Sequence, residues 1–223
     1  MVEQKDIASQ REAEFAQKYT VIALEGGPEV LQEYFHPALS LFDDEFIPVL
    51  HDAYPDPETE DVFRDNIYRD IGIRLLDSRT IFVGLVENTS ENLVGFTYAY
   101  PSQNSADIVG DDKADIDREF EASSLSLTEF NRRQERTAEV GWTIIDPLHR
   151  GKGGWSKMMD RLESKLEATG QYDDMCRTVR TANNYANGIF RSRYSAHIIY
   201  EHPTRYNIGD QIYYRVNLPK KRK

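Results

Sequence analysis

The sequence predicts an α/β protein, with a mixed and mostly antiparallel sheet flanked by helices. Three observations support this class. Short apolar runs rich in β-branched residues alternate with segments that have helical spacing. Two neighbouring runs are separated by only a few polar residues, as in a hairpin. Another run leads through a glycine-rich turn into an amphipathic segment, in the order strand, turn and helix.

The first part of the chain is expected to contain an arm, one strand and two helices. Prolines 37 and 48 are expected to interrupt the first of these helices, because proline removes a backbone donor. A breaker run with two further prolines separates the first helix from the second. The predicted elements span residues 1–18 (arm or helix), 19–24 (strand), 29–50 and 59–76 (helices).

A hairpin and a long acidic connection follow. Strands over residues 80–86 and 93–100 are expected to pair in antiparallel fashion. The next connection, residues 101–136, is far longer than the usual ~4–6 residues. It is either a solvated acidic surface or a lid that attracts a cationic amine, and residues 115–122 are expected to be helical. Its acidic residues are Asp107, Asp111, Asp112, Asp115, Asp117, Glu119 and Glu121.

The strongest functional signal begins at Glu139. An apolar strand, residues 140–145, is bounded by Asp146 and Pro147, and the run Arg150-Gly151-Lys152-Gly153-Gly154 leads into a helix that ends near Gly170. The first N–H groups of a helix lack internal partners and the helix dipole adds positive charge, so this arrangement predicts a phosphate site. The spacing fits neither a nucleoside-triphosphate P-loop nor a dinucleotide fingerprint.

The remainder of the chain predicts three strands and a short helix. Asn183 is a suitable N-cap residue for the helix, which follows directly on a strand. The expected strands span residues 175–181, 197–200 and 211–218.

The glycine-rich turn resembles the pyrophosphate loop of the GNAT superfamily of N-acyltransferases, whose pattern is [R/Q]-x-x-G-x-[G/A]. Arg150 and Gly153 match this pattern, within the family's common wording D-P-x-x-R-G-K-G. Trp155 stands where a small residue is usual. Its side chain either points into the core or reshapes the phosphate site.

A second segment carries the same resemblance. Asn183, Ala186 and Phe190 match the family pattern N-x-x-A-x-x-x-[Y/F], although Tyr194-Ser195 stands where Gly-Phe is usual. The resemblance implies one domain over residues 19–218, in which the central strand splays from its neighbour. It also implies direct transfer of an acyl group, most commonly acetyl, from acyl-CoA to an amine. The residues that it implies for cofactor binding are Ile144, Ile145, Asp146, Arg150, Gly151, Lys152, Gly153, Gly154, Trp155, Asn183 and Phe190.

The resemblance also suggests catalytic groups. Some family members use a glutamate at the position of Glu139 as a base, whereas the simpler interpretation is a solvated carboxylate at a strand end. The family's tyrosine that protonates the departing thiolate is replaced by Phe190, which has no proton to donate. Tyr194, one turn further on, is therefore the predicted proton donor, with simple packing as the alternative.

Composition narrows the function classes. The chain has 223 residues and a formal net charge of -11, so nucleic acid and anionic membranes are disfavoured partners. The single cysteine, Cys176, and five scattered histidines predict neither an internal disulfide nor a metal site. With no apolar run long enough to cross a membrane, a cytoplasmic protein is expected. The basic tail, residues 219–223, is either a solvated end or, in a eukaryote, a nuclear-import signal.

Two alternatives remain open beside the acetyl-CoA-dependent N-acetyltransferase. One is a catalytically inactive module of the GNAT fold that binds acyl-CoA or serves as a scaffold. The other is an unrelated α/β domain that binds phosphate. The acceptor is expected to be a small-molecule or peptide amine, with a cationic one favoured by the acidic connection. The oligomeric state is left open, a homodimer included.

Overall fold

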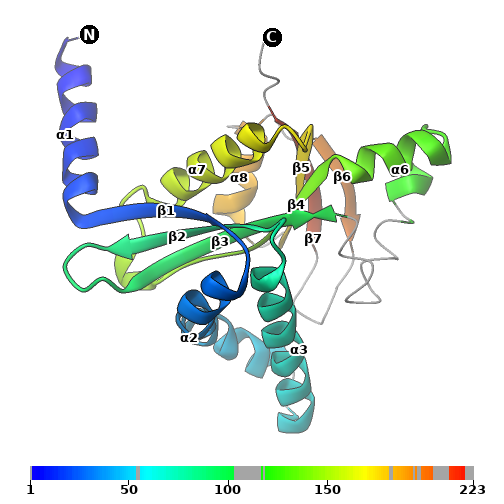
Figure 1. The fold of residues 1–223 in the computed structure, drawn as a ribbon, viewed down its shortest axis with the longest axis horizontal. Coiled ribbons are helices and arrows are strands. Elements are labelled where there is room, and N and C mark those ends of the chain that lie inside the picture. Colours follow the sequence, from blue (N-terminus) through cyan, green and yellow to red (C-terminus); the bar gives the residue numbers. More distant parts are fainter. Residues whose placement is uncertain are drawn as a thin grey trace.

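The computed structural model describes most of the chain as one sheet with helices on both faces (Figure 1). The described residues are 2–53, 56–102, 117, 119–180, 183–192, 194, 197–202 and 211–218. The acidic residues at positions 107, 111, 112 and 115 and the basic tail, residues 219–223, lie outside them.

Seven strands form the sheet, in the spatial order β1-β2-β3-β4-β5-β7-β6. All neighbouring strands are antiparallel except β4 and β5, so the predicted mixed and mostly antiparallel sheet is confirmed. The strands are β1 (Tyr19–Glu25), β2 (Ile81–Glu87), β3 (Leu93–Pro101), β4 (Thr137–Ile145), β5 (Asp174–Arg180), β6 (His197–His202) and β7 (Gln211–Asn217). The helices are α1 (Val2–Lys18), α2 (Pro28–Ala53), α3 (Pro57–Leu76), α6 (Leu127–Glu135), α7 (Gly154–Thr169) and α8 (Asn184–Ser192), with a 3₁₀ turn η2 (Pro147–His149).

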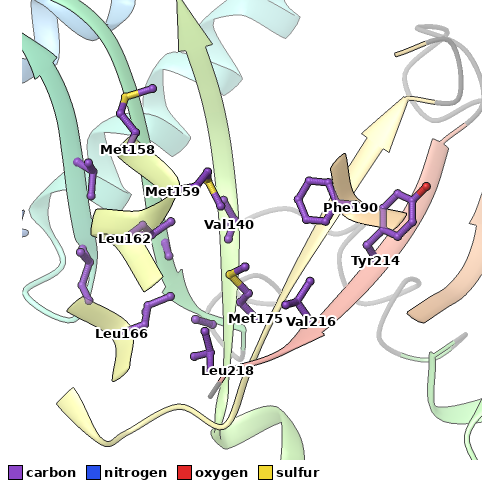
Figure 2. Close-up of a cluster of buried hydrophobic side chains, with 14 of the residues drawn as sticks. Val140, Met158, Met159, Leu162, Leu166, Met175, Phe190, Tyr214, Val216 and Leu218 are labelled. Atoms are coloured by element: carbon purple, nitrogen blue, oxygen red, sulfur yellow. The ribbon is translucent and has the colours of Figure 1, made fainter. Parts of the chain in front are cut away.

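Helices α7 and α8 cover one face of the sheet, and α2 and α3 cover the other (Figure 1). On the first face, four apolar side chains of α7 pack against the sheet without exposed surface (Figure 2). They are Met158, Met159, Leu162 and Leu166. Their spacing is that of one helical face, and Gly170, with φ of 64°, ends the helix as predicted.

The prediction that prolines interrupt α2 is wrong. The helix runs through Pro37 and Pro48 to residue 53. A proline inside a helix costs about 3 kcal/mol or more, because it removes a hydrogen bond and crowds the preceding turn. Ala38 and Phe42, which are fully buried on the α2/α3 face, supply the tertiary packing that offsets this cost.

The strands β4 and β5 part along their length, as expected. They pair only over Thr137–Glu139 and Asp174–Cys176, whereas β4 continues to Ile145 and β5 to Arg180. Figure 2 shows the two strands close together near Met175 and diverging beyond it. We call the unpaired region, residues 140–145 of β4 and 177–180 of β5, the splay.

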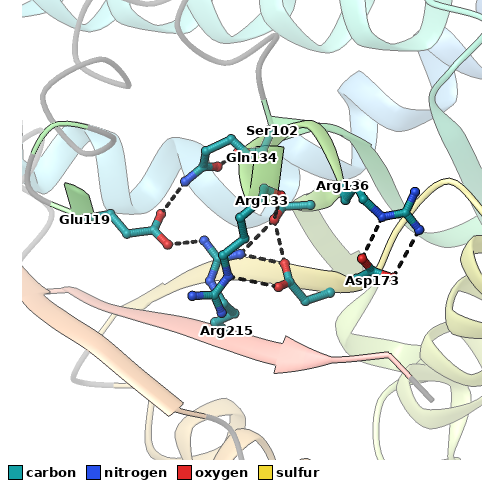
Figure 3. A network of polar contacts seen from close by, with 9 residues as sticks. Ser102, Glu119, Arg133, Gln134, Arg136, Asp173 and Arg215 are labelled. Carbon is teal, nitrogen blue, oxygen red and sulfur yellow. Dashed lines mark hydrogen bonds and ion pairs between the residues drawn. The ribbon is translucent and has the colours of Figure 1, made fainter. Parts of the chain in front are cut away.

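A buried polar network closes the paired end of β4 and β5 (Figure 3). Arg215 of β7, which is 1% exposed, donates to the hydroxyl of Thr137 at 2.7 Å and to the carboxylate of Asp174 at 2.6 Å. It also pairs with Glu119, whose carboxylate accepts a further hydrogen bond from Gln134 at 2.9 Å. Because both strands contribute to this network, it holds them together at one end only.

The acidic connection contains two features that the sequence analysis did not predict. Helix α6 begins with a capping box between Ser126 and Glu129. Glu119, expected to face solvent or a substrate, is instead buried against Arg215. A buried cation needs a nearby carboxylate, and this requirement places Glu119 inside the protein.

None of the helices in the described residues is long and apolar enough to cross a membrane. Nor does the described part of the chain bring together three or more His, Cys, Asp or Glu side chains that could hold a metal ion.

Candidate functional site

The loop before α7 presents glycines to solvent. Gly151 and Gly153 have φ of 73° and 85°, a left-handed conformation that favours glycine. Both are exposed, and a Cβ atom added to either would meet no atom within 4 Å. Gly153 is the N-cap of α7 and offers no side-chain hydrogen bond to the first turn. The first N–H groups of this helix therefore have no capping side chain and can bind an anion.

The first residues of α7 are packed against the sheet. A Cβ atom added to Gly154 would lie 2.6 Å from Cδ2 of Leu85, so the helix start approaches β2 closely. Trp155 is half-buried beside the same core, and its ring makes an edge contact with Phe190 at 6.5 Å between centroids. Of the two orientations left open by the sequence, the structure has the one that points into the core.

The cations of the loop are engaged by protein groups. Nε of Arg150 donates to the carbonyl oxygen of Ile145 at 2.9 Å, and its guanidinium pairs with Glu45 of α2. Nζ of Lys152 donates to the carbonyl oxygen of Leu148 at 2.7 Å. Both side chains are exposed, so a bound diphosphate would have to replace contacts that are individually weak.

Beyond Glu139, one edge of β4 is open. The N–H of Asp146 donates to the carbonyl oxygen of Val94 on β3 at 3.0 Å. Because backbone groups alternate in direction along a strand, those of Ile144 also face β3, and those of Thr143 and Ile145 face the splay. Of the predicted cofactor residues Ile144, Ile145 and Asp146, Ile145 alone has its backbone groups on the open edge, and those of Thr143 lie on the same edge.

A cation lies in the splay. Nη1 of Arg177, on β5, donates to Oγ1 of Thr143 at 2.5 Å, and that oxygen shares a hydrogen bond of 2.7 Å with Oγ1 of Thr97. Burial lowers the pKa of Arg177 to about 10, although Tyr194 and Tyr98 act in the opposite direction. The three polar side chains form a chain that runs from β3 across β4 to β5.

Glu139 is the last residue of β4 that pairs with β5, and it lies at the point where the strands part. It is half-buried, with its backbone in register with Tyr100 on β3. Burial, and then the charge of Glu139, raise the pKa of Tyr100 well above its usual value. The guanidinium of Arg74 lies over the Tyr100 ring, 3.7 Å from its centroid. Tyr100 therefore interacts with both the Arg74 cation and the Glu139 carboxylate.

Helix α8 places the second group of predicted residues. Oδ1 of Asn183 accepts a hydrogen bond of 3.0 Å from the N–H of Ala186, which confirms Asn183 as the cap of the helix. Phe190 is 1% exposed and stacks on Tyr214 at 5.3 Å between ring centroids. Tyr194 packs against Phe190, and its hydroxyl donates to Glu163 of α7. The structure thus brings Trp155, Phe190 and Tyr194 into one aromatic group beside the splay.

A groove of about 890 Å³ lies elsewhere, between α2 and the hairpin of β2 and β3. Burial, and then a hydrogen bond with Glu33, raise the pKa of Tyr34 in this groove to about 12. An anionic cofactor would be repelled there, because five carboxylates line the groove. They belong to Glu33, Asp44, Glu87, Glu91 and Asp146.

Sequence reasoning missed Glu45, Thr97 and Arg177. A signal for Arg177 was present, since it lies between Met175 and Val179 in a predicted strand. Alternate residues of a strand share a face, so an arginine flanked by two buried apolar residues indicates a cation under the surface. Nothing in the sequence pointed to Glu45, whose contact depends on how α2 lies over the sheet.

Comparison with known proteins gives a likeness in structure alone. Neither a protein-family model nor a curated protein sequence matches the chain. An acetyltransferase of the GNAT family from Staphylococcus aureus superposes with a TM-score of 0.52 at 13% identity, covering 90% of this chain and 100% of that one. The protein yncA from Salmonella typhimurium, solved with its cofactor acetyl-CoA, gives 0.52 at 14% identity, with 92% and 97% covered. The spermidine/spermine N-acetyltransferase SpeG from Vibrio cholerae gives 0.51 at 13% identity, with 90% and 94% covered.

Proposed function

The chain has the GNAT fold, and from this premise we propose that it is an N-acyltransferase that transfers an acetyl group from acetyl-CoA to an amine. The observation that carries the proposal is the splay, where the backbone groups of Thr143 and Ile145 face an edge of β4 that β5 does not cover. An extended amide-containing chain can add to such an edge as an extra strand does. The exposed glycine loop before α7 then follows the end of the same strand.

The pantetheine arm is proposed to lie along Thr143 and Ile145, with the diphosphate at the N–H groups of Gly151 to Gly154. The geometry supports this placement, because the left-handed glycines leave open space above the loop and Trp155 is turned into the core. Arg150 and Lys152 are proposed to join the diphosphate by exchanging their present partners. Asn183 and Phe190 border the splay from α8 in this arrangement.

The chemistry needs a positioned amine, a polarised carbonyl and a path for one proton. Glu139 is proposed to take the proton from the attacking amine, since it is the last residue of β4 that pairs with β5. Tyr194 is proposed to return a proton to the departing sulfur. Its hydroxyl now donates to Glu163, so this role requires that the hydrogen bond be exchanged during turnover.

The acceptor class is proposed from charge. Asp117 and Glu121, which precede α6 in the chain, are exposed and would attract a cationic amine. Glu119 is instead paired with Arg215. A panel for screening should therefore contain polyamines, aminoglycosides and lysine peptides beside neutral amines. The SpeG likeness adds spermidine and spermine to that panel.

Titration of CoA into the purified protein tests the proposal, followed by detection of free thiol when acetyl-CoA and the amine panel are added. Saturable CoA binding with thiol release is expected. Binding without turnover would favour the inactive acyl-CoA-binding module, which the loss of a hydroxyl at Phe190 supports. Absence of CoA binding would exclude both functions.

A further inference from the structure

Arg177 is placed where β4 and β5 begin to part. It follows Cys176, the last residue of β5 that pairs with β4. Its guanidinium reaches across the splay to the hydroxyl of Thr143, at 2.5 Å. Its neighbours Met175 and Val179 share its face of the strand and are buried in the core beneath α7 and α8. The side chain is therefore directed into the region between the strands, where it remains partly exposed.

The charge of Arg177 has no carboxylate partner among the residues that the structure describes. Within the part of the chain that the structure describes, it forms no ion pair, and its hydrogen bond goes to a neutral hydroxyl. Arg74 and Arg215, which are buried, have such partners in Asp70 and Glu119. Even a partly desolvated cation without a counterion is costly. The structure accounts for this cost if negative charge arises beside Arg177 during the reaction.

The position of Thr143 indicates where the negative charge would arise. Its backbone N–H faces the open edge of β4, where the proposed function puts the thioester end of the pantetheine arm. Its side chain holds the Arg177 guanidinium and is itself fixed by Thr97 at 2.7 Å. Arg177 is thus oriented by a chain of hydrogen bonds before any substrate arrives, as an electrostatic catalyst requires.

We infer that Arg177 is a catalytic residue that donates a hydrogen bond to the thioester carbonyl oxygen and stabilises the oxyanion formed there. The inference rests on the proposed acyl transfer. The amine nitrogen attacks the carbonyl carbon, a C–N bond forms, and the π electrons move onto the oxygen beside Arg177. When the carbonyl re-forms, the C–S bond breaks and CoA leaves as thiolate. The proton lost by the amine nitrogen is passed on and ends on the sulfur.

A non-reactive analogue separates this inference from the proposed function. In acetyl-CoA whose sulfur is replaced by a methylene group, the ¹³C-labelled ketone stands for the thioester carbonyl. Its stretching band, measured by infrared difference spectroscopy, is expected to move to lower frequency when the analogue binds the wild-type protein. Arg177→Met should abolish this shift and Arg177→Lys should keep part of it. Arg161→Met, which removes an exposed arginine of α7, should behave as wild type.

Kinetics provide the second measurement. With an amine that the wild-type protein acetylates, Arg177→Met is expected to lower kcat by about 100- to 1,000-fold, which is the usual effect of losing a donor to the oxyanion. The KM for acetyl-CoA should change little. A structural role would instead leave the carbonyl frequency of the bound analogue unchanged in all variants, and that result overturns the inference while CoA binding preserves the proposed function. Failure of the wild-type protein to bind CoA overturns both. If Arg177→Met does not fold, Arg177→Lys decides by the same frequency shift.

Discussion

Arg150 in the loop before α7 is paired with Glu45 of α2, although the two residues come from opposite sides of the sheet's end. The pair places a carboxylate beside the loop whose N–H groups are proposed to bind a diphosphate. It therefore both positions the guanidinium and competes with the ligand for it.

Replacing Glu45 by Gln should strengthen CoA binding. The change removes the competing charge and leaves a side chain of the same shape, and an exposed pair is worth about 0–1 kcal/mol, so a gain of up to about fivefold in affinity is expected. Calorimetric titration with CoA measures it. Glu29→Gln, at the start of α2, alters the net charge equally and should leave the affinity unchanged. Weaker binding by Glu45→Gln would contradict a role of Arg150 at the diphosphate.

The left-handed glycine at the start of α7 can be tested against a helical one. Gly153→Ala should destabilise the protein by about 1–2 kcal/mol, the cost of a Cβ atom in this conformation, and should weaken CoA binding. Gly188→Ala in α8 meets no atom within 4 Å and should stabilise by about 0.5–1 kcal/mol. Urea unfolding measures both changes. The two changes in the free energy of unfolding need not be equal in size. An increase in stability in Gly153→Ala would contradict the left-handed conformation of the loop.

The network around Arg215 should contribute far more to stability than its exposed counterpart. Glu119→Gln leaves a buried cation poorly compensated and is expected to cost about 3–5 kcal/mol. Asp173→Asn breaks the pair with Arg136, in which both side chains are more than 40% exposed, and should cost about 1 kcal/mol or less. Thermal unfolding of the two variants, which carry the same charge change, gives the comparison. Similar losses would mean that Glu119 is solvated.

Buried tyrosines predict a loss of stability in alkaline solution. Burial, and then Asp70 for Tyr98 and Glu139 for Tyr100, raise the pKa of both hydroxyls well above the usual value, and the pKa of Tyr34 is raised to about 12. An unfolded tyrosine loses its proton near pH ~10, so above this pH the unfolded state binds fewer protons than the folded state. The free energy of unfolding should then fall by up to about 1.4 kcal/mol per pH unit and tyrosine.

Urea titrations between about pH 8 and pH 11 test this expectation, because no tyrosine contribution changes below pH ~10. Tyr100→Phe removes one of the tyrosines whose pKa is raised, and its stability should decline less steeply than that of the wild type. Parallel declines would show that Tyr100 does not titrate differently in the two states.

Tyr194→Phe tests the proposed proton donor. Loss of the hydroxyl should lower kcat more than it changes KM for acetyl-CoA, because proton delivery to the sulfur is part of the chemical step. Steady-state kinetics with an accepted amine measures the two constants. Glu163→Gln keeps a partner for the hydroxyl and serves as the comparison. An unchanged kcat in Tyr194→Phe would assign the proton to water or to CoA itself.

Much of the fold could be predicted because its signals are local. The single apolar face of α7, the stop at Gly170 and the hairpin of β2 and β3 each follow from spacing and turn chemistry. Helix α6 could have been found too, since Ser126 and Glu129 form a capping-box pattern in the sequence.

What could not be predicted depends on tertiary contacts. Pro37 and Pro48 are ordinary helix breakers, and only the burial of α2 against the sheet explains why the helix continues. The glycine loop was predictable from its motif, whereas the Arg150–Glu45 pair was not, because it joins residues far apart in the sequence. The contact of Arg177 with Thr143 likewise exists only because two strands that start as neighbours then separate.

The origin of Arg215 has a consequence for biosynthesis. Glu119, Thr137 and Asp174 all leave the ribosome before β7 is made, and β7 carries Arg215, which pairs with both carboxylates. Until β7 inserts beside β5, burial of the Glu119 carboxylate would be penalised, because its cationic partner is Arg215. Pairing of β7 with β5 is therefore the step that closes the end at which β4 and β5 are held together.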